Sequence, residues 1–470
     1  MVFSSALFLF VFLPVTLAGY YLIRKELRNA FLLMASLLFY AAGEPSFVVI
    51  MAISILLNYL LGLLIWKFSH RKKAISKILL MLSLCLNLGI LFYYKYYDFA
   101  VLNLNRIFGT SIALRNIVLP IGISFFTFQG MSYVLDVYMG KTDAQVNPIN
   151  VALYIALFPQ LIAGPIVRYS DVNREIESRC ENLNDFASGV QRFVFGLAKK
   201  VILSNAFAVI ADEAFTMNSA ERDVAMAWLG VVAYAIQIYF DFSGYSDMAI
   251  GLGRMFGFHF HENFDYPYTS SSVTVFWRKW HISLSSWFRD YVYIPLGGNR
   301  RGNVYLNLFI VFFLTGLWHG ASWNFVFWGL WHGCFLIIER VLRKKHIEIP
   351  IPRAFKWAYT MLVVLIGWVF FRAPGFLDGL EYLKSMAGIH SAGLISAKTF
   401  FYFREYFVSF LIAALSCTPV YRKIKCRFDR NETRKLVGCA VQDIATIIIF
   451  LLTIGTLSIT TYNPFIYFNF

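Results

Sequence analysis

Apolar runs close to the length of a membrane span recur along the whole sequence and constrain the fold most strongly. The 470 residues are 59% hydrophobic and 15% charged, whereas soluble domains are about 45–50% apolar and about 25% charged. A helix of about 20 apolar residues crosses the hydrocarbon core, and the segments 47–66 and 224–252 are of that kind. We predict an all-α polytopic membrane protein with roughly eleven transmembrane helices plus re-entrant helices.

The basic residues stand in short clusters between the apolar runs. The net charge is +15, but clusters such as Arg24, Lys25 and Arg28 indicate cytoplasmic loops near anionic lipid rather than a nucleic-acid groove. With this cluster and the one at 67–77 inside, the amino terminus lies outside. The run 2–23 is predicted to be a retained first helix, because no small-x-small cleavage site precedes Arg24. We expect a multi-pass protein of the bacterial plasma (inner) membrane.

Two apolar segments are interrupted in a way that ordinary spans are not. Pro120 and Gly122 break the run 117–138, and a proline there predicts a kink or a half-helix. The run 151–163 is short and ends at Gly164-Pro165, so it is expected to be re-entrant. No linker separates two folding units, and one membrane domain over residues 1–470 is the simplest organisation.

Tryptophans and histidines gather in one part of the chain. Seven of the eleven tryptophans lie between residues 277 and 331, where they form either an aromatic interfacial belt or part of a site. Ser270 to Ser272 offer a helix N-cap, and the helix after them would carry Trp277 and His281 on one apolar stripe. Its composition predicts a helix in the membrane interface or one that dips into the membrane.

His319 is the strongest candidate for a chemical role. It ends the apolar run 307–318 between Gly316 and Gly320, and small residues let a backbone or a slender ligand approach. An ionisable side chain at membrane depth is a functional hypothesis by default. The alternative is a histidine that hydrogen-bonds two helices together. His332 repeats the pattern thirteen residues later with a weaker claim.

Buried acids and absent motifs complete the evidence from residues alone. Asp241 shares a helical face with Gln237 and Tyr245, and a structural polar network that shapes a cavity explains it best. Asp136 receives the same interpretation. The sequence has no Walker loop, GxSxG elbow or HExxH pair. Its six cysteines are widely spaced, so neither a disulfide framework nor a bound metal is expected.

Several sequence blocks together resemble the membrane-bound O-acyltransferases, most closely those that O-acetylate polysaccharides. The densest blocks surround His281, His319 and Asn299, and others lie at both ends of the chain. They are Met1 to Ser5, Leu119 to Phe125, Leu161 to Pro165, Tyr239 to Ala249, Phe276 to Ser285, Leu296 to Arg300, Gly316 to Gly320 and Phe465 to Phe468.

The resemblance implies a ring of helices around a central funnel or tunnel, with a catalytic core at about residues 118–340. It implies that His319 is the catalytic histidine and acts as general base, while His281 is the second catalytic position. Substrate binding is assigned to Trp280, Trp318, Asp241 and Asn299. No cofactor is bound permanently, since the acyl thioester donor, acetyl-CoA or an acyl carrier protein, is a substrate.

The resemblance also implies an extracytoplasmic partner of the SGNH-hydrolase type that completes transfer onto a cell-surface or secreted polysaccharide. Two alternatives stay open. One is D-alanyl transfer to teichoic acid with a carrier-protein donor. The other is a polysaccharide or lipid transporter with gating histidines, although transporters often show paired interrupted helices in two halves, and no such symmetry is evident.

Overall fold

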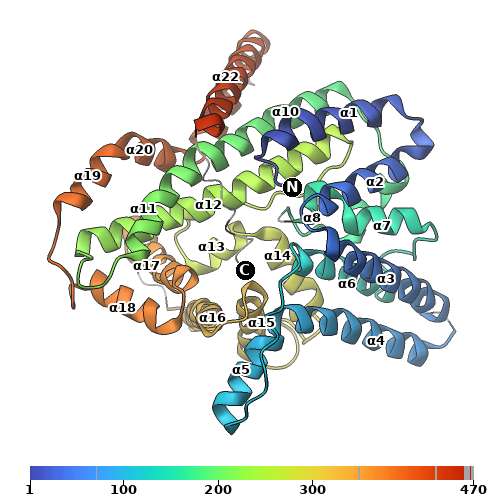
Figure 1. The fold of residues 1–470 in the computed structure, drawn as a ribbon, viewed down its shortest axis with the longest axis horizontal. Coiled ribbons are helices and arrows are strands. Elements are labelled where there is room, and N and C mark those ends of the chain that lie inside the picture. The colour runs from blue at the N-terminus through green and yellow to red at the C-terminus, as the bar shows by residue number, and fades with distance from the viewer. Residues whose placement is uncertain (70, 163, 348–349, 429–430, 460–465, 467–470) are drawn as a thin grey trace. The chain divides into compact units, whose positions relative to one another are not determined.

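The computed structural model describes residues 1–470 except 70, 163, 348–349, 429–430, 460–465 and 467–470 (Figure 1). The described part of the chain is helical and contains no strand, which confirms the all-α prediction. It divides into two compact units. Unit 1 is Met1–Phe193 with Met248–His261, and unit 2 is Val194–Asp247 with Glu262–Phe470. The single-domain organisation stays a prediction.

Unit 1 is built from helices connected by short turns. It also contains the start of α10 (Leu183–Ala198) and the end of α12 (Val224–Met255). Its other elements in chain order are η1 (Phe8–Phe12), α1 (Leu13–Leu22), η2 (Lys25–Leu27), α2 (Arg28–Ala41), η3 (Pro45–Phe47), α3 (Val48–Ser69), α4 (Lys73–Leu91), η4 (Phe92–Tyr96), α5 (Tyr97–Phe108), α6 (Ile123–Tyr138), α7 (Pro148–Ala156), α8 (Phe158–Leu161) and α9 (Tyr169–Glu177).

A buried pair of amides joins two apolar helices of unit 1. Asn58 of α3 and Asn87 of α4 each donate from Nδ2 to the other's Oδ1 at 3.0 Å. Gly130 of α6 faces this pair, because a Cβ at that position would lie 2.4 Å from Asn58 Nδ2. Hydrogen bonds between polar side chains can hold membrane helices together, because apolar side chains contact lipid as favourably as they contact another helix.

Unit 2 holds the whole of the tryptophan-rich segment. Its elements are η5 (Lys199–Ser204), α11 (Asn205–Thr216), most of α12, η6 (Pro267–Thr269), α13 (Val273–Lys279), α14 (Ile282–Phe288), η7 (Arg289–Tyr293), α15 (Val304–His319), α16 (Trp323–Lys344), α17 (Arg353–Arg372), α18 (Phe376–Met386), α19 (Ala397–Glu405), α20 (Phe407–Ser416), α21 (Val420–Phe428) and α22 (Glu432–Ile459). Helices α15 and α16 pack against each other, and α17 lies against α16 (Figure 1).

Among the described residues, seven helices are long and apolar enough to cross a membrane, or eight if the bent pair α20 and α21 is one span. The predicted count of roughly eleven crossings is therefore not confirmed, and two further apolar helices, Phe8–Leu22 and Val304–His319, are shorter than a span. The ring around a funnel stays a prediction. The seven are Pro45–Ser69, Lys73–Phe108, Leu183–Thr216, Val224–Met255, Trp323–Lys344, Arg353–Arg372 and Glu432–Ile459.

Both interrupted segments are broken in the structure. Gly122 adopts φ +77° and α6 starts only after it, so the proline-containing part of the run is not helical. The run 151–163 is divided between α7 and α8 at Leu157, and Asn147 caps α7 with its side chain. Ala163, Phe465, Tyr467 and Phe468 lie outside the described residues.

Candidate active site

The helix predicted to carry Trp277 and His281 on one stripe is broken at His281. Ser272 caps α13 as expected, since its Oγ accepts from the Val275 N–H at 3.1 Å. The helix then ends at Lys279, and His281 takes left-handed angles of φ 46° and ψ 56° before α14 begins. Only a few non-glycine residues adopt such angles. The predicted continuous helix from Trp277 to His281 was therefore wrong.

Asn263 holds the ring of His281. Its Oδ1 accepts from the Ser283 N–H at 3.1 Å and lies 3.2 Å from His281 Nδ1, while its Nδ2 donates to Ser246 at 3.1 Å. The backbone N–H can only donate, so this oxygen is an acceptor and Nδ1 must carry the proton. His281 is 1% exposed, and its Nε2 has no hydrogen-bond partner among the described residues. Nε2 therefore presents a lone pair.

The hairpin of α15 and α16 places His319 at the end of α15. Asn303 caps the start of this helix, and Gly316 touches the backbone of Phe325, where a Cβ would lie 2.5 Å from the carbonyl oxygen. His319 is 3% exposed and its ring contacts those of Trp328 at 4.8 Å and Phe371 at 5.1 Å. The predicted close approach at this glycine is present, but the neighbour is the backbone of α16.

The two predicted catalytic histidines lie against the same indole. Trp318 is 5.9 Å from the ring of His281 and 4.9 Å from the ring of His319, measured between centroids. It is 4% exposed. Histidines 38 positions apart in sequence thus belong to one buried cluster in unit 2. The third histidine, His332, packs on Trp328 at 5.3 Å and on Trp277 at 5.1 Å, next to the pair.

The other residues assigned to substrate binding differ in their surroundings. Trp280 is 2% exposed and packs on Trp368 at 4.9 Å, within the aromatic layer around the histidines. Asn299 is exposed in the turn before α15, where it accepts from the Tyr293 hydroxyl at 2.7 Å. No contact joins Asn299 to the histidines among the described residues. Roles in substrate binding stay predictions for both residues.

Asp241 is the acid of a buried ion pair. Its Oδ1 lies 2.5 Å from Lys200 Nζ, and its Oδ2 accepts from the Ile466 N–H at 2.9 Å. The side chains of the pair are 1% and 4% exposed. An ion pair is the kind of contact that the structural interpretation of Asp241 expects, and its role in substrate binding stays a prediction. The partner lysine was not identified from the sequence.

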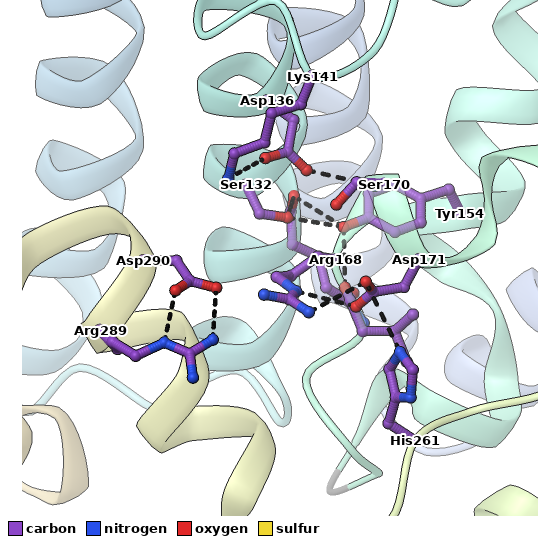
Figure 2. Close-up of polar contacts among 12 residues, drawn as sticks. Ser132, Asp136, Lys141, Tyr154, Arg168, Ser170, Asp171, His261, Arg289 and Asp290 are labelled. Atoms are coloured by element: carbon purple, nitrogen blue, oxygen red, sulfur yellow. Dashed lines mark hydrogen bonds and ion pairs between the residues drawn. The ribbon is translucent and has the colours of Figure 1, made fainter. Parts of the chain in front are cut away.

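A separate polar network lies in unit 1. Asp136 pairs with Lys141 at 3.2 Å and accepts from the Ser170 N–H at 3.2 Å (Figure 2). Figure 2 also shows Arg168 against Asp171, at 2.9 Å. Asp136 therefore joins the end of α6 to the start of α9, in agreement with its structural interpretation.

Comparison with known proteins decides the family. The model of the membrane-bound O-acyltransferase family matches residues 142–377. A probable alginate O-acetylase of Pseudomonas putida is 42% identical over 498 aligned positions, which cover the whole of both chains. The chain belongs to the membrane-bound O-acyltransferase family. The matched region contains both histidines of the buried cluster.

Two further relatives of this O-acyltransferase differ in their sequence identity to it and in the share of the chain that they match. A peptidoglycan O-acetyltransferase of Helicobacter pylori is 36% identical over 84% of this chain and 81% of its own. A teichoic acid D-alanyltransferase of Bacillus subtilis is 28% identical over 54% of this chain and 67% of its own. The acetyl-transferring relatives are thus matched over a larger share of the chain.

Sequence reasoning missed two polar residues with contacts to His281 or to the helix that precedes it. Asn263 orients His281, and Glu339 of α16 accepts from the N–H groups of Val273 and Thr274 at 2.7 and 2.9 Å. Asn263 stands in a loop and gave no periodic signal. Glu339 did offer a signal in the sequence, because it is the acidic residue of a helix whose charged residues are otherwise basic.

Proposed function

We propose that this O-acyltransferase moves acetyl groups from a cytoplasmic thioester donor across the membrane for the O-acetylation of a cell-surface or secreted polysaccharide. The observation that carries the proposal is the buried pair His281 and His319, whose rings both contact Trp318. The choice of acetyl and polysaccharide is supported by relatives named as an alginate O-acetylase and a peptidoglycan O-acetyltransferase.

The length of α15 supports a place for His319 inside the apolar layer. Its 16 residues rise about 24 Å at 1.5 Å each, which is less than the hydrocarbon core of about 30 Å. Arg300 and Arg301 precede the helix and favour the headgroup region at its start. The other end, which bears His319, then lies within the bilayer, where an acceptor and a donor from opposite sides can meet.

We assign the role of general base to His319. Its imidazole takes the proton of an acceptor hydroxyl as that oxygen attacks the thioester carbonyl carbon. The carbon–sulfur bond then breaks, the acetyl group stays on the acceptor oxygen as an ester, and the thiolate receives the proton from the imidazolium. His281, whose Nδ1 proton is directed to Asn263, packs on the same indole as His319 and orients the pair.

The donor and the partner belong to the same proposal. The donor is acetyl-CoA or an acyl carrier protein, and no cofactor or metal is held permanently. An extracytoplasmic protein of the SGNH-hydrolase type receives the acetyl group and completes its transfer. The enzyme lies in the bacterial inner membrane with its basic loops on the cytoplasmic side, in contact with anionic lipid and not with nucleic acid.

Mass spectrometry of envelope polymers tests the function directly. Deleting the gene should remove acetyl esters from one polysaccharide, and the wild-type gene on a plasmid should restore them. Loss of D-alanine with acetyl esters retained would instead establish D-alanyl transfer to teichoic acid. If both esters persist and polymer export fails, the chain is a transporter.

A further inference from the structure

Glu339 is a carboxylate whose hydrogen bonds all lead to the helix that precedes His281. It lies on α16 and accepts from the Val273 N–H at 2.7 Å, the Thr274 N–H at 2.9 Å and the Thr274 hydroxyl at 2.5 Å. A charged acceptor makes stronger hydrogen bonds than a neutral one. Such a carboxylate, with three donors converging on it, fixes the first turn of α13 against α16.

One face of α16 contacts both His319 and helix α13. Trp328, His332 and Glu339 are four and seven residues apart, which places them on the same side of a helix. Trp328 packs on His319 at 4.8 Å, and Trp328 and His332 both pack on Trp277 of α13. Helix α16 therefore contacts His319 through Trp328, and it contacts α13 through three residues, Trp328, His332 and Glu339.

We propose that Glu339 is a positioning residue for acyl transfer, which sets the place of His281 relative to His319. Helix α13 has only seven residues, so displacement at its first turn is transmitted to the turn at Trp280 and His281. Helix α16 also packs on His319. The Glu339 hydrogen bonds therefore fix the position of His281 relative to His319 through their shared contact with α16. This inference rests on the proposed function of the histidine pair.

The test is a double-mutant cycle with purified full-length protein in proteoliposomes, with acetyl-CoA as the probe and release of free CoA thiol as the readout. Wild-type turnover, absent in His319→Ala, establishes the activity independently of Glu339. Glu339→Gln keeps the shape of the side chain but turns an acceptor into an amide donor against the N–H groups of α13. We expect its kcat to fall about tenfold to hundredfold with KM within twofold, since small misplacements are costly.

The cycle distinguishes positioning from general support of the fold. On the His281→Gln background, Glu339→Gln should lower the turnover by less than twofold, because the residue it positions is already gone. An equal loss on both backgrounds, or wild-type kcat in Glu339→Gln alone, would overturn the proposal. Thr274→Val, which removes only the hydroxyl contact, should give an intermediate loss and serves if Glu339→Gln does not fold. Glu381→Gln, at an exposed carboxylate on α18, is the matched control and should leave kcat unchanged.

Discussion

Lys200 and Asp241 form an ion pair inside unit 2, with Nζ 2.5 Å from Oδ1 and neither side chain more than 4% exposed. Two charges so deeply buried are stable only as partners, because each alone would keep its desolvation cost. The pair joins η5 to α12, and Ser204 adds a hydroxyl contact at 3.3 Å. The ion pair explains why Asp241 can be buried without assigning this residue a role in proton transfer.

Removing one member of this pair should destabilise the protein strongly. We expect Asp241→Asn to cost about 3–5 kcal/mol, because Lys200 stays buried without a counter-charge. The double variant Lys200→Met and Asp241→Asn should recover part of that loss. Thermal unfolding in detergent measures both, and an Asp241→Asn protein as stable as the wild type would show that the pair is solvated.

A close backbone approach in the α15 and α16 hairpin gives a second prediction. Gly316→Ala would place a Cβ 2.5 Å from the Phe325 carbonyl oxygen, which is backbone and cannot move aside. Overpacking of this kind costs about 1–3 kcal/mol, and it should also lower transfer because His319 ends the same helix. Gly455→Ala on α22 is the control, since the Cβ that it adds would meet no atom within 4 Å. Unfolding and activity should be unaffected there.

A pH dependence is expected in unit 1 outside the membrane spans. Burial disfavours the charged ring of His259, but hydrogen bonds to Glu175 and Asp185 with the charges of those acids outweigh it and raise the pKa of His259. The contribution to stability is complete below the ordinary histidine value of about 6.5 and is lost as the pH rises through the higher folded value. The side chain is 49% exposed, so the effect is below about 1 kcal/mol.

The measurement for His259 is the unfolding temperature as a function of pH. The wild type should lose stability relative to His259→Gln as the pH rises above about 6.5, because that variant has no ring that can gain or lose a proton. His346→Gln, at an exposed histidine, should follow the wild-type curve. Parallel curves for the wild type and His259→Gln would contradict the assignment.

Much of the fold could be predicted because hydrophobic length is a local property. The runs now seen as α3 and α12 were recognised from composition, and Pro120 and Gly122 marked the break before α6. The count of crossings could not be predicted, because segments such as α15 are apolar but too short. Length alone does not separate a half-helix from a span.

The site was predicted in part. His281 and His319 were identified from their sequence surroundings, but the left-handed turn at His281 was not, since its helical spacing looked continuous. The acceptor that orients His281, Asn263, is 18 residues away in a loop. The partner of Asp241 comes from another helix altogether. Such pairings depend on tertiary packing, which a single sequence does not reveal.

The most direct measurement of the central claim is acyl transfer by His319→Ala compared with His332→Ala. Both imidazoles are buried in the same aromatic cluster, so the second variant controls for the loss of a packed ring. We expect His319→Ala to be folded, inserted in the membrane and inactive, while His332→Ala retains transfer at a reduced rate. Normal acetylation of the polymer by a folded His319→Ala protein would contradict the account.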